Sequence, residues 1–266
     1  MITNGNPARY IAALDMDDTL LNSEGVLSPR TLDTLRRWRA AGHHTVIATG
    51  RPPRSIGASL PQEMHDIPWI AYNGAVIHWR GRKIYENLIS VDETQAILAL
   101  IQARLPDSAL GLEIDNQLYF NQTIDRTSPY QVADLMQVAN QPAAKILFYH
   151  EDFDALHGLL GELPPGARAM LSGKYKLVQI LAASADKAEA LRVMAEKLGH
   201  SLADVVAFGD DVNDVEMVRA SGMGVAVDNA IDEVKAVADR ITHSNDEEGV
   251  ARVLEEILAQ EVAPAR

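Results

Sequence analysis

Two carboxylates lie two residues apart directly after the first apolar run of the chain. Residues 10–14 are typical of a buried strand, and Asp15 and Asp17 follow at once. Side chains at positions i and i+2 of an extended backbone point the same way, so both carboxylates should face one spot beyond the strand. Crowded carboxylates repel each other unless a cation or a shared proton relieves them. The segment is a candidate metal and catalytic site, although a polar turn through Asp18 and Thr19 explains it equally well.

A second polar group follows the next apolar run, at residues 45–48. The hydroxyl of Thr49, the backbone amides around Gly50 and the guanidinium of Arg51 together suit an anion. The signal is weak by itself because turns at strand ends often contain Thr-Gly. Arg51 is as well explained by packing on the turn as by a contact with substrate.

The third group is acidic and follows a strand expected at 205–208. Asp210, Asp211, Asn213 and Asp214 offer hard oxygen ligands, which Mg²⁺ prefers. Capping of the following helix explains one or two acidic residues here, but not three together with an asparagine. A calcium-binding loop is excluded, since neither acidic segment has glycine at loop position six and glutamate at position twelve.

The elements that must position these groups alternate between strand and helix at both ends of the chain. We expect strands at 10–14, 45–48, 205–208, 225–227 and 240–242, and helices at 28–41, 186–198, 213–220, 231–238 and 247–259. Ser28 before Pro29 is a strong helix start, and Gly42 and Gly199 are helix stops. This alternation predicts an α/β fold with a Rossmann-like parallel sheet that has helices on both faces.

The middle of the chain has a different pattern. It predicts hairpins at 76–85 and 112–120, helices at 94–105, 129–138 and 153–163, and strands at 145–149, 167–171 and 177–181. Hairpins mixed with helices indicate an α+β module inserted into the α/β one. We place the insertion at residues 84–183, so that residues 1–83 and 184–266 form the core.

A lysine, Lys187, opens the helix expected at 186–198. A lysine at a helix N-terminus opposes the helix dipole, a mild cost that suggests a use, although alone it predicts a solvated surface residue. All four features share one position, because each lies at or just beyond the carboxyl end of an expected strand. Ligands of open α/β sheets bind at that edge.

Composition narrows the function classes. The net charge of −13 argues against nucleic acid as a partner, because phosphate backbones require clustered Lys and Arg. The chain has no cysteine, which excludes disulfides, thiolate zinc sites and a cysteine nucleophile and fits a cytoplasmic protein. We expect no signal peptide and no bilayer-spanning segment. The oligomeric state, monomer or homodimer, is open.

In the order of these motifs the chain resembles the haloacid dehalogenase-like hydrolases, and more closely their Cof-type sugar phosphatase branch. The resemblance covers both halves of the core and rests on Asp15–Leu21, Ala48–Pro52, Tyr72-Asn73-Gly74-Ala75, Lys187, Phe208–Asp214, Gly224–Ala230 and Ser244–Ala251. The middle segment matches only in position and size, where this branch has a large α+β cap. The chain departs from the family at Asp18, where glycine is usual, and at Ala188, where glycine is common.

The resemblance implies a Mg²⁺-dependent phosphatase of small phosphorylated metabolites, with sugar phosphates as the expected class. Asp15 would be the nucleophile that forms an aspartyl-phosphate, and Asp17 the general acid and base. Three residues, Thr49, Lys187 and Asn213, would hold the phosphoryl oxygens, with Gly50 and Arg51 beside them. The Mg²⁺ ligands would be Asp15, the backbone carbonyl of Asp17, and Asp210, with Asp214 acting through water or as an orienting group.

Two other functions are compatible with this fold. A phosphomutase of hexose phosphates would return the phosphoryl group to a sugar rather than to water, and no sequence feature favours it. A non-catalytic binding module should have lost Asp15, Asp17, Lys187 or Asp210, and all four are present. The substrate itself is not indicated, since cap residues choose it.

Overall fold

The computed structural model describes residues 10–262, which form two compact units. The first combines the described residues up to Ile84 with those from Asp186 onward. The second, Tyr85–Ala185, is inserted between them. The first unit is therefore built from both ends of the described chain.

The described part of the first unit contains an eight-stranded sheet in the order β14-β13-β12-β1-β2-β3-β4-β5. Its strands are β1 Ile11–Leu14, β2 His44–Ala48, β3 Trp69–Ala71, β4 Val76–Trp79, β5 Arg82–Glu86, β12 Val205–Gly209, β13 Met223–Ala226 and β14 Arg240–Ile241. Pairing is parallel from β14 to β3, and β4 runs antiparallel to β3. The expected parallel sheet is present, and it includes a short strand, β3, that the sequence did not predict.

The central strand of this sheet is β1. All four of its residues are buried, and Ile11 is in register with Val205 on one side and His44 on the other. A strand with apolar side chains on both faces is stable only where both faces are covered. Because β1, β2 and β12 are parallel and adjacent, the segments that follow them meet at one edge of the sheet.

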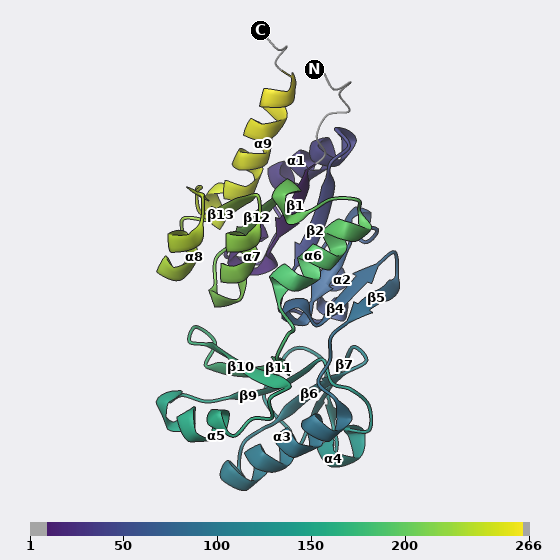
Figure 1. Cartoon of the computed structure of the whole chain (residues 1–266), viewed down its shortest axis with the longest axis vertical. Coiled ribbons are helices and arrows are strands. Elements are labelled where there is room, and N and C mark those ends of the chain that lie inside the picture. The colour runs from purple at the N-terminus through teal and green to yellow at the C-terminus, as the bar shows by residue number, and fades with distance from the viewer. Residues whose placement is uncertain (1–9, 263–266) are drawn as a thin grey trace. The chain divides into compact units, whose positions relative to one another are not determined.

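Helices cover both faces of the sheet (Figure 1). They are α1 Pro29–Ala40, α2 Pro53–Ser59, α6 Lys187–Lys197, α7 Val215–Ala220, α8 Asp232–Val237 and α9 Gly249–Val262. α1 packs against α9 on one face, and α6 packs against α7 on the other. The Ser28 side chain accepts a hydrogen bond from the Thr31 N–H, as expected for the N-cap of α1.

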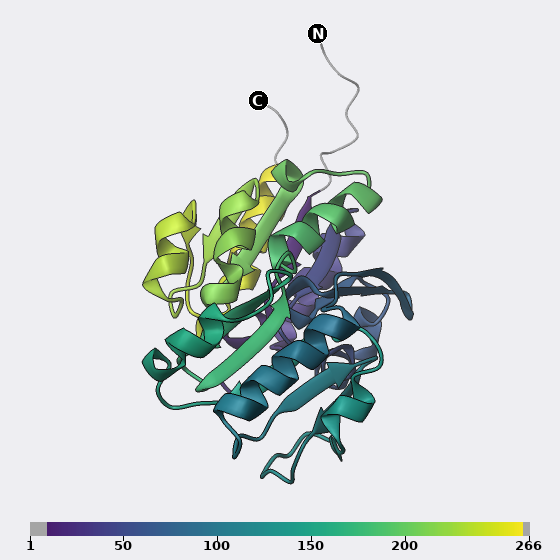
Figure 2. The ribbon, with the colours of Figure 1, turned by 60° about the horizontal axis from the view of Figure 1, so that its bottom comes forward.

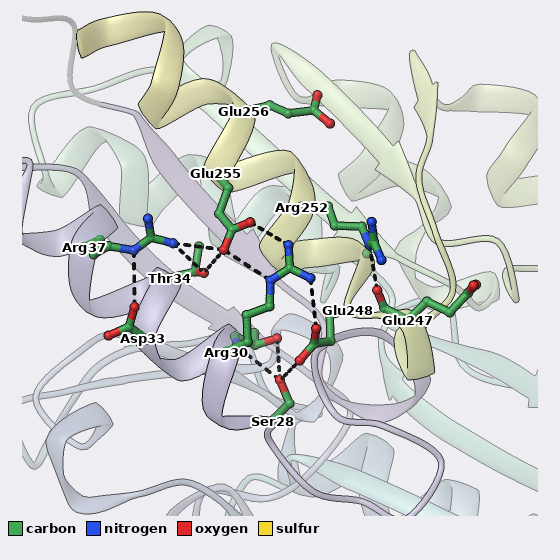
Figure 3. Close-up of polar contacts among 12 residues, drawn as sticks. Ser28, Arg30, Asp33, Thr34, Arg37, Glu247, Glu248, Arg252, Glu255 and Glu256 are labelled. Carbon is green, nitrogen blue, oxygen red and sulfur yellow. Dashed lines mark hydrogen bonds and ion pairs between the residues drawn. The ribbon is translucent and has the colours of Figure 1, made fainter.

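A cluster of charged residues joins α1 to α9 (Figure 3). The Glu255 carboxylate accepts hydrogen bonds from Arg30 at 2.7 Å, Arg37 at 2.9 Å and the Thr34 hydroxyl at 2.9 Å. Arg30 also pairs with Glu248 at 3.1 Å. The hydrogen bond from Arg30, opposed by partial burial, holds the pKa of Glu255 below its usual value. The negative form of Glu255 therefore stabilises the fold.

Replacing Glu255 with glutamine is expected to lower the unfolding free energy at pH 7 by about 1 kcal/mol, the upper range for an exposed pair. Because the folded pKa is depressed, this stabilisation is present above the unfolded pKa of about 4.3 and is lost as pH falls through the folded pKa. Denaturant titrations at pH 7 and pH 3 check this. An equal difference between wild type and variant at both pH values would contradict it.

The inserted unit contains, among its described residues, a six-stranded sheet in the order β10-β11-β9-β6-β7-β8. Its strands are β6 Gly111–Ile114, β7 Gln117–Phe120, β8 Gln131–Val132, β9 Lys145–Tyr149, β10 Ala167–Ser172 and β11 Leu177–Ala182, and its helices are α3 Val91–Arg104, α4 Leu135–Val138 and α5 His157–Gly161. Figure 2 shows α3 lying along this sheet. The unit is α+β, as the sequence predicts.

The prediction of a helix at 129–138 is wrong for most of these residues, because only Leu135–Val138 is helical. Residues Gln131–Val132 form β8, which pairs in parallel with Tyr119 and Phe120 of β7. The helix begins only after Asp134, whose carboxylate accepts a hydrogen bond from the Met136 N–H at 3.0 Å. Taking Pro129 as the helix start overlooked this later N-cap and the free edge of β7.

None of the helices formed by residues 10–262 combines the length and the apolar character needed to cross a membrane.

Candidate active site

The residues predicted to do chemistry converge at the carboxyl edge of the core sheet. Asp15 directly follows β1, and its backbone N–H donates to the Phe208 carbonyl of β12 at 3.1 Å. Lys187 is the first residue of α6, and its side chain is fully buried. Its ammonium donates to Asp15 Oδ1 at 2.7 Å and to Asp214 Oδ1 at 2.6 Å. The position of Lys187 at a helix start alone predicted a solvated residue. In the structure Lys187 is instead buried and forms ion pairs with Asp15 and Asp214.

Three carboxylates could hold a cation. One oxygen from each of Asp15, Asp210 and Asp214 lies within 4.8 Å of the other two, so these three carboxylates are close enough to bind one metal ion. Asp214 Oδ1 accepts from Lys187, and its Oδ2 accepts from the backbone N–H groups of Asp210 and Asp211 at 3.2 and 3.3 Å. Hydrogen bonds thus occupy both Asp214 oxygens, which suits the orienting role predicted for it. The hard oxygen donors of the cluster fit Mg²⁺.

The cluster of Asp15, Asp210 and Asp214 contains more negative than positive charge, since Lys187 is the cation that contacts it. Burial, followed by the neighbouring Asp214, raises the pKa of Asp15 well above its usual value, although Lys187 opposes the shift. Burial and Asp214 likewise raise the pKa of Asp210 to about 7. Burial lowers the pKa of Lys187, but Asp15 and Asp214 together outweigh it and the net shift is upward. Three carboxylates therefore share one ammonium, and a divalent cation would balance the rest.

Asp17 has a different partner from Asp15. Its carboxylate accepts two hydrogen bonds from the Arg51 guanidinium, one of them at 2.8 Å from Nε, in a bidentate pair. Arg51 also donates to the Ser59 hydroxyl at 2.5 Å. The turn Met16–Leu20 is irregular rather than extended, and Asp18 within it has φ of +58°. The sequence placed both carboxylates at one spot; in the structure Arg51 binds one and Lys187 the other.

The predicted anion-binding residues form a second group beside the acidic one. Thr49 follows β2, is buried, and its hydroxyl accepts from the Arg51 N–H at 3.2 Å. Asn213 lies in the turn Val212–Asp214, and its Nδ2 donates to Asn73 Oδ1 at 2.9 Å. The same Asn73 side chain packs on Gly50, where a Cβ would lie 2.9 Å from Asn73 Oδ1. Asn73 therefore links Gly50 to Asn213.

Two asparagines hold the turn after Asp15. Asn229 Nδ2 donates to the carbonyl of Asp18 at 2.7 Å, and Asn245 Nδ2 donates to the carbonyl of Leu21 at 3.0 Å. The Asn245 N–H in turn donates to Asn229 Oδ1 at 2.9 Å. These residues belong to the segments 224–230 and 244–251, so the C-terminal part of the core fixes the backbone that carries Asp17.

Sequence reasoning missed three contacts. The Thr19 hydroxyl donates to Asp210 Oδ1 at 2.9 Å, although the sequence predicted only a turn at Thr19. The Arg51–Asp17 pair and the Asn73 contacts also went unpredicted. For Thr19 and Asn73 a signal existed, since both lie inside segments that support the family resemblance.

Comparisons with known proteins agree with this geometry. A model of the haloacid dehalogenase-like hydrolases matches residues 12–254. The chain belongs to this family. It is 31% identical to the 5-amino-6-(5-phospho-D-ribitylamino)uracil phosphatase YitU of Bacillus subtilis, over 94% of this chain and 98% of the relative. It is also 31% identical to the pyridoxal phosphate phosphatase YbhA of Escherichia coli, over 92% and 97%.

A solved structure of a haloacid dehalogenase-like hydrolase from Bacteroides thetaiotaomicron superposes with a TM-score of 0.81, at 28% identity, over 94% of this chain and 99% of that one. As a haloacid dehalogenase-like hydrolase, the chain is an enzyme that hydrolyses phosphoric monoesters, not a non-catalytic module. The positive φ of Asp18 explains the glycine usual in these hydrolases, because glycine adopts that conformation without strain.

Proposed function

We propose that this enzyme is a Mg²⁺-dependent phosphatase of small phosphorylated metabolites that acts through an aspartyl-phosphate. The observation that supports this most directly is the buried Asp15 carboxylate, hydrogen-bonded to Lys187 at 2.7 Å inside a cluster of three carboxylates. A carboxylate is a weak nucleophile toward an anionic ester, and it needs fixed positive charge nearby to approach phosphorus.

In the first step, an Asp15 oxygen forms a bond to phosphorus as the bond to the ester oxygen breaks. Asp17 gives its proton to the leaving alkoxide. In the second step, Asp17 takes a proton from a water molecule whose oxygen bonds to phosphorus, and inorganic phosphate leaves Asp15. In this structure both Asp17 oxygens accept hydrogen bonds from Arg51, so one of these hydrogen bonds has to open before Asp17 transfers a proton.

In this proposal the phosphoryl oxygens would be held by Lys187, which donates to Asp15, and by the Thr49 hydroxyl and the Asn213 amide. The carboxylates of Asp15 and Asp210 and the backbone carbonyl of Asp17 would hold Mg²⁺, with Asp214 orienting them. When bound, the ion supplies positive charge that offsets the repulsion between carboxylate and phosphate.

The substrate is proposed at the level of chemical class. The two relatives are named for phosphorylated small molecules, one with a ribityl chain and one with a pyridine ring. We propose sugar phosphates as the first class to test, with the inserted unit as the cap that selects among them. A screen of phosphorylated metabolites at fixed Mg²⁺, ranked by kcat/KM, tests this. A cytoplasmic location and a monomeric or homodimeric state remain predictions.

Removal of divalent cations is expected to reduce hydrolysis of p-nitrophenyl phosphate at least about 100-fold, because the buried carboxylates then lack their counter-charge. Added Mg²⁺ should restore the rate. Binding of Mg²⁺ should also raise the unfolding temperature of the protein, and the stabilisation should keep growing with the logarithm of the Mg²⁺ concentration above Kd. Equal rates with and without chelator, together with an unchanged unfolding temperature, would rule out the proposed metal dependence.

A further inference from the structure

A strained turn adjoins the candidate site and has no part in the mechanism above. Tyr72, Asn73 and Gly74 have successive φ values of +51°, +55° and +97°, and all three are buried. Left-handed backbone is unfavourable for side chains other than glycine, and least so for asparagine. Such strain persists only where the surrounding structure fixes it, and it concentrates at functional sites.

The backbone of this turn is tied to two parts of the site. The Asn73 N–H donates to the Thr49 carbonyl at 3.0 Å, and the Tyr72 N–H donates to the Arg51 carbonyl at 3.1 Å. On the other side Gly74 lies directly against Asp186, where a Cβ would come within 2.1 Å of the Asp186 carbonyl oxygen. The turn therefore joins the Thr49 loop to the residue that precedes Lys187.

The side chain of Asn73 reaches a third part. Its Oδ1 accepts the hydrogen bond from Asn213 Nδ2 at 2.9 Å, and Asn73 itself is 1% exposed. An acceptor at this place selects the NH₂ end of the Asn213 amide. With the Asn73 oxygen facing Asn213, as in this structure, a flipped Asn213 amide would place two oxygens together, which is repulsive. One N–H of Asn213 is thereby occupied, and the second stays a donor, the chemistry that an anionic phosphoryl oxygen needs.

We propose that Asn73 is a positioning residue that fixes the orientation of the Asn213 amide, so that the second N–H of this amide is presented to the phosphoryl group. This inference rests on the proposed role of Asn213 in holding phosphate. It assigns to Asn73 a task distinct from catalysis, because the Asn73 side chain acts on the phosphoryl group only through Asn213.

The first test is Asn73→Gly, which removes the side chain but keeps the backbone N–H and tolerates the positive φ. We expect inorganic phosphate to bind about tenfold more weakly, and kcat/KM for p-nitrophenyl phosphate to fall about tenfold, because a donor is then misplaced. Gly50→Ala approaches the same contact from the other side, since its methyl group would displace the Asn73 amide. The two variants should share one phenotype.

The second test introduces Asn73→Gly into an Asn213→Ala background. If Asn73 acts through Asn213, the added change should alter phosphate affinity and kcat/KM less than about twofold. Full additivity there would overturn the inference, as would an unchanged phosphate affinity in Asn73→Gly. Calorimetric titration with inorganic phosphate gives the affinity without turnover. An inactive wild type would refute the proposed function, while the calorimetric cycle would still decide the role of Asn73.

Discussion

Replacing Asp15 with asparagine is expected to reduce kcat for ester hydrolysis by about 10⁴-fold or more, the scale on which loss of a covalent nucleophile acts. Asparagine has the same shape, so Lys187 can still donate to its side-chain oxygen at the position of Asp15 Oδ1. The amide cannot form the aspartyl-phosphate. The loss should appear in kcat, with the affinity for phosphate changed far less.

The fold should survive this substitution. Burial raises the pKa of Asp15, which means that its charge is costly in the folded protein. A neutral amide avoids that cost, so we expect an unfolding temperature no lower than that of wild type. Acid quench followed by mass spectrometry should find a phosphoryl group on the peptide containing Asp15 in wild type and none in the variant. Equal turnover by both proteins would refute Asp15 as nucleophile.

Replacing Lys187 with methionine is expected to reduce kcat/KM by about 10³-fold, since the variant loses a fixed charge aimed at the transferred group. It should also lower the unfolding free energy by roughly 3–5 kcal/mol, the usual cost of breaking a buried ion pair. Both effects follow from one ammonium that pairs with Asp15 and with Asp214 while its side chain is fully buried.

A double variant separates the two effects. Adding Asp214→Asn to Lys187→Met removes one of the two buried carboxylates that then lack their cationic partner, so stability should recover in part. Activity should not recover, because the ammonium is still absent. Chemical denaturation in the presence of chelator, with turnover measured at saturating Mg²⁺, checks both. If the single variant is as stable as wild type, the buried pair does not have the role described here.

Much of the core fold follows from local sequence. The apolar run at 10–14, the Ser28-Pro29 helix start and the glycine stops each predict an element that the structure contains. The sequence-based predictions fail for strands that form only because a neighbouring strand pairs with them. β3 is three residues long, too short for a periodic signal, and exists because β2 and β4 flank it. Gln131–Val132 is a strand only because β7 offers it an edge.

The candidate site divides in the same way. Residue type and position at strand ends placed Asp15, Thr49 and Asp210 at one edge, because parallel neighbouring strands end together. Lys187 follows β11, which belongs to the sheet of the inserted unit, so this reasoning does not account for its position. Which carboxylate pairs with which cation could not be predicted. That choice depends on the irregular backbone at 16–20, where Asp18 departs from an extended chain and separates Asp17 from Asp15.

The central place of β1 governs when the enzyme can become active during its synthesis. Thr19 and Asp210, which are hydrogen-bonded, are 191 residues apart in the chain. At typical elongation rates the ribosome needs roughly 10–40 s to add that length. Until β12 emerges, one edge of β1 has no partner, and the whole inserted unit has to emerge before β12 does. A fragment that ends before residue 205, once released from the ribosome, should therefore contain the complete inserted unit and an incomplete, chaperone-accessible core.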